Sequence, residues 1–245
     1  MKHHLHVPGN WQLPEAIRKR IGSTAGRQRL MEADGQMLMI LHEVPDTNET
    51  VRMGMLFWRD GEGQWRAGNG KHGETELKNL IERYASKLEE FDKLEHAAKL
   101  ADEYSSVLEG LLPIVRAARN LLEVLEDARK SDRSDRTLID PRDRAYDICR
   151  WADLLYDDTK NAMEVAVVRR AEEQARAGHH MLVSAHRLNV LAALFFPFAT
   201  LGAIFGTTLT DNWSWSNTPL PFFIFLGLSA VTGLVLAAIV SRPIR

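Results

Sequence analysis

Two apolar stretches decide the fold: residues 188–209, LNVLAALFFPFATLGAIFGTTL, and residues 220–240, LPFFIFLGLSAVTGLVLAAIV. Neither stretch contains a charged residue. Each has about 20 residues, and at roughly 1.5 Å per residue this spans the ~30 Å hydrocarbon core of a bilayer. A helix of a soluble protein is rarely apolar on all faces over such a length. The sequence therefore predicts a transmembrane hairpin whose helices are joined by residues 210–219.

Charges on either side of the hairpin indicate its direction. The loop 210–219 contains one acid, Asp211, and no Lys or Arg. Arg187 precedes the first span, and Arg242 and Arg245 follow the second. Because positive flanks stay on the cytoplasmic side, we expect both termini in the cytoplasm and the loop outside. The expected location is the cell (inner) membrane, as a multi-pass protein with the lipid bilayer as its partner.

The composition argues against several functions. The formal charge is −2, whereas a nucleic-acid-binding surface has to be basic, so we expect no nucleic-acid partner. The single cysteine, Cys149, excludes an intrachain disulfide and suits the cytosol. We find no nucleophile elbow, His-Glu metal motif or P-loop in the sequence, so we expect neither an enzyme nor a resident cofactor.

Residues 27–70 have the turn residues and apolar patterning of a small antiparallel sheet. Asp34 and Gly35 suit a hairpin turn in which both central residues need a positive φ. The glycines between residues 61 and 70 follow neither the dinucleotide nor the Walker spacing, which indicates ordinary turns rather than a phosphate-binding loop. The predicted strands are Arg29–Glu32, Gln36–His42, Val51–Arg59 and Gln64–Ala67.

Residues 74–130 carry apolar side chains at steps of three and four, which predicts a long helical hairpin. Gly110 and Pro113 mark its expected break or kink. The charged residues on the other faces are expected to be solvated.

A further helix is expected after the hairpin. Asp140 suits its cap and Pro141 its first position, and the pattern then continues to Thr208. One helix of this extent would be about 100 Å long at roughly 1.5 Å per residue, and it would lead from the cytosolic part into the first span. Gly178 is either a hinge or a glycine tolerated within this helix.

The expected fold class is an α+β membrane protein with a small antiparallel β-sheet domain, a long helical hairpin and stalk helix, and two C-terminal transmembrane helices. Most of the chain is therefore expected outside the membrane. The predicted segments are a small N-terminal α/β cytosolic domain (1–72), a cytosolic helical hairpin (73–139), a stalk helix (140–187), the first transmembrane helix (188–209), an outer loop (210–219), the second transmembrane helix (220–240) and a basic cytosolic tail (241–245).

The first span resembles the first membrane helix of the CorA family of magnesium and divalent-cation transporters. It has the small and apolar residues of that helix, a mid-span proline (here Pro197) and a glycine-containing stretch at the outer end. The short outward loop, the basic tail and the long stalk helix are similar too. The resemblance implies a homopentamer in which the first span of each subunit lines a pore for Mg²⁺ or another divalent cation.

The signature of that family is altered in this chain, which resembles a divergent member. In the family a Gly-Met-Asn tripeptide lies at the outer mouth, where its Asn meets the hydrated ion. The matching positions here are Gly206, Thr207 and Thr208. Threonine hydroxyls can accept hydrogen bonds from the waters that Mg²⁺ retains. The resemblance therefore assigns these three residues to the ion pathway, with Asp211 as the acid of the outer mouth.

Two neighbouring stripes of the first span are candidates for the pore lining. One contains Asn189, Phe196 and Thr200, and its polar members suit a water-filled path. Phe196 belongs to both stripes, so its ring is a candidate hydrophobic gate. The alternative is close packing, in which small residues let helices approach and threonine hydroxyls bond back to their own helix. The second stripe, which the resemblance favours, is Leu188, Ala192, Phe196, Ala199 and Ala203.

Acidic side chains on the stalk are candidates for regulation. Asp153, Asp157 and Asp158 lie at helical spacing. In the CorA family, divalent cations bound between subunits hold the channel shut, and the physical basis is the relief of charge repulsion. The resemblance makes these three residues a candidate regulatory metal site, and a solvated acidic face is the alternative.

The expected function is that of a CorA-like channel or transporter which passes metal cations, Mg²⁺ or another divalent ion, down their electrochemical gradient. Two alternatives stay open. One is a CorA-like, ligand-gated membrane effector in stress or defence signalling. The other is a non-conducting, membrane-anchored coiled-coil protein.

Overall fold

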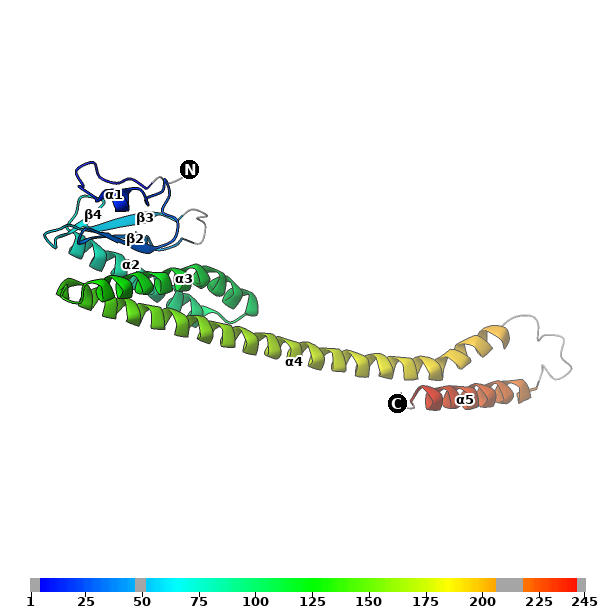
Figure 1. Ribbon diagram of the computed structural model, residues 1–245. Helices are drawn as coiled ribbons and strands as arrows, with labels where there is room; N and C mark the ends of the chain where they lie inside the picture. The colour runs from blue at the N-terminus through cyan, green and yellow to red at the C-terminus, as the bar shows by residue number, and fades with distance from the viewer. Residues whose placement is uncertain (1–4, 47–51, 206–217, 242–245) are drawn as a thin grey trace. The chain divides into compact units, whose positions relative to one another are not determined.

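The computed structural model describes residues 5–46, 52–205 and 218–241, and the chain divides into two compact units (Figure 1). The N-terminal unit is Met1–Val168 and the C-terminal unit is Arg169–Arg245. One helix, α4 (Ile139–Phe205), contributes residues to both units.

The N-terminal unit is built on a four-stranded antiparallel sheet with the strand order β1-β2-β3-β4. In the turn from β1 to β2, Asp34 has a φ of 51° and Gly35 a φ of 73°, the two positive angles that the predicted turn requires. All four predicted strands are confirmed, although the third begins at Gly54; its predicted start, Val51, lies outside the described residues. The strands are β1 (Arg29–Ala33), β2 (Gln36–His42), β3 (Gly54–Arg59) and β4 (Trp65–Ala67).

Both faces of this sheet are covered. On one face Met39 of β2 belongs to the main core, which the following helices complete. On the other face Ile40 packs in a second cluster with Trp11 and Ile17 of the N-terminal segment. Figure 1 shows α1 on one side of the sheet and two longer helices on the other. These helices are α1 (Glu15–Arg18), α2 (Gly73–Ala97) and α3 (Ala101–Ser131).

The break of the helical hairpin lies at residues 98–100. Of the predicted break or kink at Gly110 and Pro113, the break is wrong. Both residues lie inside α3. Proline removes one backbone donor, and the burial of neighbouring core side chains offsets that loss. The chain turns instead where the Glu103 carboxylate accepts hydrogen bonds from the backbone N–H groups of Lys99 and Leu100, at 2.7 and 3.0 Å. This acceptor satisfies donors that the start of α3 leaves without helical partners.

The stalk helix starts slightly earlier than predicted. A short 3₁₀ helix, η1 (Arg136–Leu138), leads directly into α4. The N-cap of η1 is Asp135, whose carboxylate accepts a hydrogen bond from the Thr137 N–H at 2.9 Å. Asp140, the predicted cap, instead lies in the first turn of α4. The prediction of one long helix is confirmed for the described residues, since α4 has 67 residues and continues through Gly178.

The first part of α4 closes the core of the N-terminal unit. Its buried side chains include Ile148, Ala152 and Leu155. Cys149 lies beside them and is 8% exposed. Burial raises the pKa of the Cys149 thiol, and the nearby Asp153 carboxylate adds to this effect. The cysteine is therefore an unreactive packing residue.

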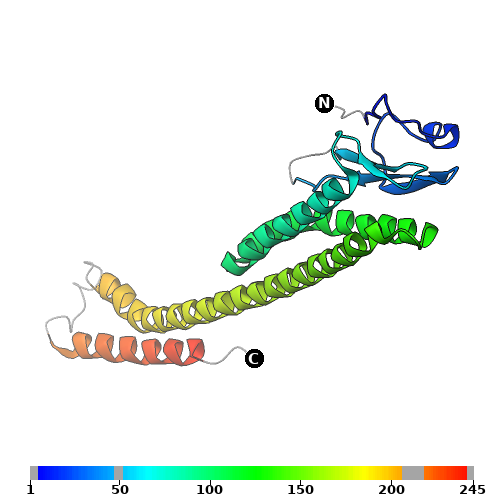
Figure 2. The ribbon, with the colours of Figure 1, turned by 90° about the vertical axis from the view of Figure 1, so that its left-hand side faces the viewer.

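The C-terminal unit consists of the remainder of α4 and the helix α5 (Leu220–Val240). Both α4 and α5 are long and apolar enough, by length and composition, to cross a membrane. Figure 2 shows that α5 runs alongside the last part of α4. The unit thus has the two helices that the apolar stretches predict.

Candidate ion pathway

The two apolar helices contact each other through small side chains of α5. Ser229 is fully buried, and Gly233 is buried next to it on the same face. A Cβ atom placed on Gly233 would lie 2.7 Å from the carbonyl oxygen of Leu194, which is closer than real Cβ atoms approach other atoms. On α4, Pro197 is buried on this side as well. Small residues therefore allow the backbones to approach closely, as is usual between membrane helices.

Replacing Gly233 with alanine is expected to destabilise the α4–α5 contact by about 1–3 kcal/mol, because backbone atoms of α4 cannot move away as a flexible side chain would. The measurement is the thermal unfolding midpoint of the full-length protein in detergent. Gly227→Ala is the matched control, since a Cβ atom at Gly227 meets nothing within 4 Å. Equal midpoints for the two variants would contradict the contact.

The predicted pore residues lie on the side of α4 that α5 leaves uncovered. Asn189 and Thr200 are exposed, and the Phe196 side chain is 67% exposed. The Thr200 hydroxyl donates to the Phe196 carbonyl at 2.9 Å, so its proton is engaged within the helix and its lone pairs stay open as acceptors. The apolar stripe is exposed too, at Leu188, Ala192, Phe196, Ala199 and Ala203.

The predicted outer mouth lies outside the described residues. Gly206, Thr207 and Thr208 follow the described part of α4 in the sequence, and Asp211 belongs to the predicted outer loop. Their assignment to the ion pathway stays a prediction.

The acidic residues predicted to bind a regulatory metal have different surroundings. Asp153 is held within its own chain, because its Oδ1 accepts hydrogen bonds from Nε and Nη2 of Arg119 at 3.0 and 2.8 Å. This hydrogen bond and the charge of Asp153 raise the pKa of Arg119. Asp157 and Asp158 are exposed. Among the described residues no group of three or more His, Cys, Asp or Glu side chains is placed to hold a metal ion.

A polar network between the end of the sheet and α2 could not be predicted from the sequence. Arg83 of α2 binds the Glu43 carboxylate through Nε and Nη2 at 2.8 and 2.9 Å. The buried Glu76 lies 3.2 Å from Lys71 and 3.5 Å from Arg83. Burial acts to raise the pKa of Glu76, but the two cations outweigh it and keep that pKa below its ordinary value. These partners are up to 40 residues apart, so no local motif signals them.

Solved structures are similar to this chain in fold, whereas the sequence matches no family model and no curated protein. The cytoplasmic domain of ZntB from Vibrio parahaemolyticus aligns with 66% of this chain and 80% of its own, with a TM-score of 0.54 and 11% identity. The full-length CmaX protein aligns with 93% of this chain and 83% of its own, with a TM-score of 0.47 and 12% identity. The complete CorA magnesium transporter from Methanocaldococcus jannaschii aligns with 88% of this chain and 79% of its own, with a TM-score of 0.42 and 14% identity.

The likeness to the ZntB domain shows the fold of the two thirds of this chain that align with it. The chain has a four-stranded antiparallel sheet, a long helix and an apolar C-terminal helix. Together these features confirm the α+β, CorA-like fold class predicted from the sequence.

Proposed function

We propose that the protein conducts metal cations, Mg²⁺ or another divalent ion, across the membrane down their electrochemical gradient. One observation carries the proposal: a fold like that of the ZntB cytoplasmic domain continues, through the single helix α4, into a pair of apolar helices of membrane length. The resemblance of the first span to that of the CorA family supports the same reading from sequence alone. In this topology both termini lie in the cytoplasm of a cell (inner) membrane protein.

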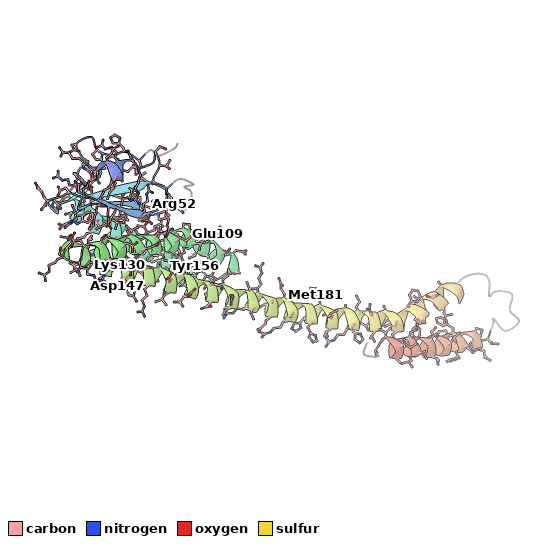
Figure 3. All side chains as sticks on the ribbon, in the orientation of Figure 1. Arg52, Glu109, Lys130, Asp147, Tyr156 and Met181 are labelled. Carbon is pink, nitrogen blue, oxygen red and sulfur yellow. The ribbon has the colours of Figure 1, made fainter. Side chains whose placement is uncertain are left out.

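The proposed assembly is a homopentamer with the first span of each subunit around the pore. Exposed apolar side chains support an assembly, because water-exposed helices rarely present so many of them. Met181, which projects from α4 in Figure 3, is 70% exposed. Further exposed apolar side chains of α4 are Val165, Val167, Val168 and Leu182. In a ring of subunits, neighbouring copies of α4 would cover such faces.

The proposed pathway runs past Asn189, Phe196 and Thr200 to the Gly206–Thr208 segment at the outer mouth. The Thr hydroxyl oxygens would accept hydrogen bonds from the waters of a hydrated cation. The Phe196 rings would close the path by excluding water. Membrane potential supplies the driving force, about 2.3 kcal/mol per charge per 100 mV, or roughly 4.6 kcal/mol for a divalent ion, so no ATP site is needed.

Reconstituted liposomes test the function. We expect at least one of Mg²⁺, Zn²⁺ and Co²⁺ to enter protein-containing vesicles under an inside-negative potential, with protein-free vesicles and Na⁺ as controls. Flux that starts only after a cell extract is added would favour the ligand-gated effector instead. If none of the four ions enters the vesicles, with or without the extract, both conducting functions are contradicted. The non-conducting, membrane-anchored coiled-coil protein is then the remaining alternative.

Particle images of the purified protein test the assembly separately. Five-fold symmetry is the expected result, because the pore needs a ring of first spans. A monomer or a dimer would contradict the proposed pore, whatever the flux assay reports.

A further inference from the structure

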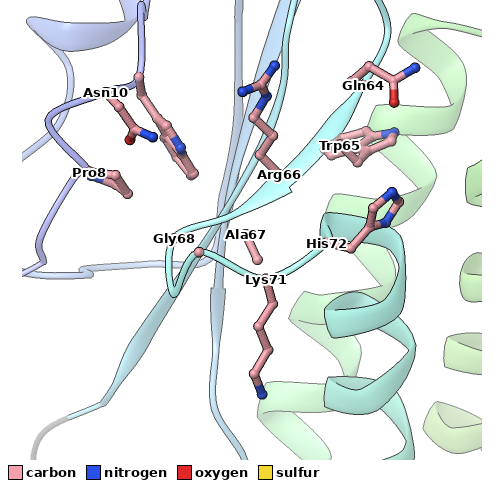
Figure 4. A pocket seen from close by; sticks show the side chains of 11 residues that line it. Pro8, Asn10, Gln64, Trp65, Arg66, Ala67, Gly68, Lys71 and His72 are labelled. Carbon is pink, nitrogen blue, oxygen red and sulfur yellow. The ribbon is translucent and has the colours of Figure 1, made fainter.

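A cleft of about 590 Å³ opens in the N-terminal unit, and none of the residues of the proposed ion pathway lines it. One wall is the N-terminal segment with Asn10, and the other is the end of β4 with the loop that leads into α2 (Figure 4). Its basic lining residues are Arg66, Lys71 and His72, and no acidic residue lines it. A cleft with this lining favours an anion over a cation.

Two neighbouring side chains, Asp60 and Trp58, fix the position of Arg66 in the cleft. Asp60 Oδ2 accepts hydrogen bonds from Nε and Nη2 of Arg66 at 3.1 and 2.8 Å, and the guanidinium lies over the Trp58 ring at 5.5 Å. Asp60 is itself buried, whereas Arg66 is half-exposed. The remaining nitrogen, Nη1, makes no hydrogen bond within the described part of the chain. A fixed guanidinium with a free nitrogen is ready to bind an anion at little cost in side-chain entropy.

The other polar groups differ in how well they can join Arg66. In Figure 4 the Asn10 and Gln64 amides lie on either side of Arg66, and His72 lies below Trp65. Lys71 extends in another direction, along α2, where it pairs with Glu76 at 3.2 Å. The donors available to a ligand in the cleft are therefore the guanidinium, the imidazole and the two amides.

The loop at the floor of the cleft keeps the backbone accessible. Gly70 has a φ of 79°, and a Cβ atom placed on it would meet nothing within 4 Å, so the space beside this residue is open. The loop leads into the first turn of the 25-residue helix α2, whose N-terminal dipole adds a weak positive field. The glycine spacing excludes a Walker motif, but the loop still joins a strand directly to a long helix.

We propose that this cleft binds a small phosphate-bearing ligand. The Arg66 guanidinium binds the phosphate group, and the other donors that line the cleft, the His72 ring and the amides of Asn10 and Gln64, donate to the same group or to the rest of the ligand. The proposal goes beyond the proposed ion conduction and does not depend on it, because binding in the cleft is measured without flux.

Calorimetric titration of the full-length protein in detergent tests this site, with inorganic phosphate and AMP as the two probes. We expect at least one probe to bind. Binding of AMP alone assigns part of the affinity to the organic moiety, and binding of both assigns it to the phosphate group. Removing one charge-assisted hydrogen bond is worth about tenfold in affinity, which is the loss expected for Arg66→Gln.

Matched variants separate a lost contact from a lost fold. Arg66→Gln leaves the buried Asp60 without its partner, so His72→Gln, which keeps that ion pair, serves as the second variant. It is expected to weaken binding severalfold with an unchanged melting temperature. Arg176→Gln is the control, because Arg176 is exposed on α4 and does not line the cleft. The site is overturned if neither probe binds, if His72→Gln binds normally, or if Arg176→Gln weakens binding equally.

Discussion

Replacing Tyr84 with alanine is expected to lower the free energy of unfolding of the N-terminal unit by about 3–5 kcal/mol. The Tyr84 side chain is fully buried in the core between the sheet and the helices. Its hydroxyl donates to the His42 carbonyl at 3.1 Å, which ties α2 to the end of β2. Burial raises the pKa of Tyr84, so this donor keeps its proton at neutral pH. The substitution removes the ring volume and leaves the carbonyl without its donor.

The measurement is a denaturant titration of the full-length protein followed by tryptophan fluorescence, since Trp58 and Trp65 lie in the same unit. Tyr84→Phe isolates the hydrogen bond and is expected to cost about 1 kcal/mol. Tyr146→Ala is the control for an exposed tyrosine, because Tyr146 on α4 is 53% exposed. If Tyr146→Ala lowers the free energy of unfolding as much as Tyr84→Ala does, burial of the side chain does not explain the loss of stability.

Replacing Phe196 with alanine is expected to raise the resting cation flux severalfold, because a ring of small side chains no longer excludes water from the pathway. The result depends on the proposed conduction. The assay is ion entry into liposomes under conditions in which the unmodified protein is closed. We expect the ion flux through the closed protein to increase and the ion selectivity to stay the same.

Phe195 provides a close control for this experiment. It is the preceding residue of α4, it is 61% exposed, and it points from a different side of the helix. Phe195→Ala is therefore expected to leave the leak unchanged. A conducting protein whose leak is the same with and without the Phe196 ring would remove Phe196 from the role of gate. Equal leaks from both variants would show a general loosening of the helix pair instead.

The sheet could be predicted from the sequence because its signals are local. The apolar run of β2 and the turn at Asp34 and Gly35 both lie within a few residues of the chain. The hairpin break was misplaced because the strongest local breaker, Pro113, is outweighed by core burial around it. The actual turn depends on a single carboxylate, that of Glu103, which resembles any other surface acid in the sequence.

The residues of the candidate sites could likewise be predicted where the signal is local, and not where it depends on contacts between distant segments. Helical periodicity placed Asn189, Phe196 and Thr200 on one face, and the structure leaves that face uncovered by α5. The pairing of Asp153 with Arg119 joins residues 34 positions apart, so only the packing of α3 against α4 reveals it. The cleft at Arg66 likewise needs the N-terminal segment to fold back near β4, and no pattern in either segment indicates that contact.

The burial of Cys149 makes the protein well suited to spectroscopy. It is the only cysteine in the chain, and with 8% of its surface exposed it is expected to react slowly with maleimide reagents. A cysteine introduced at an exposed position therefore carries a spin label or fluorophore once per subunit without mutation of the native thiol. Counting bleaching steps or measuring dipolar couplings between such labels then reports the number of subunits directly in a lipid bilayer.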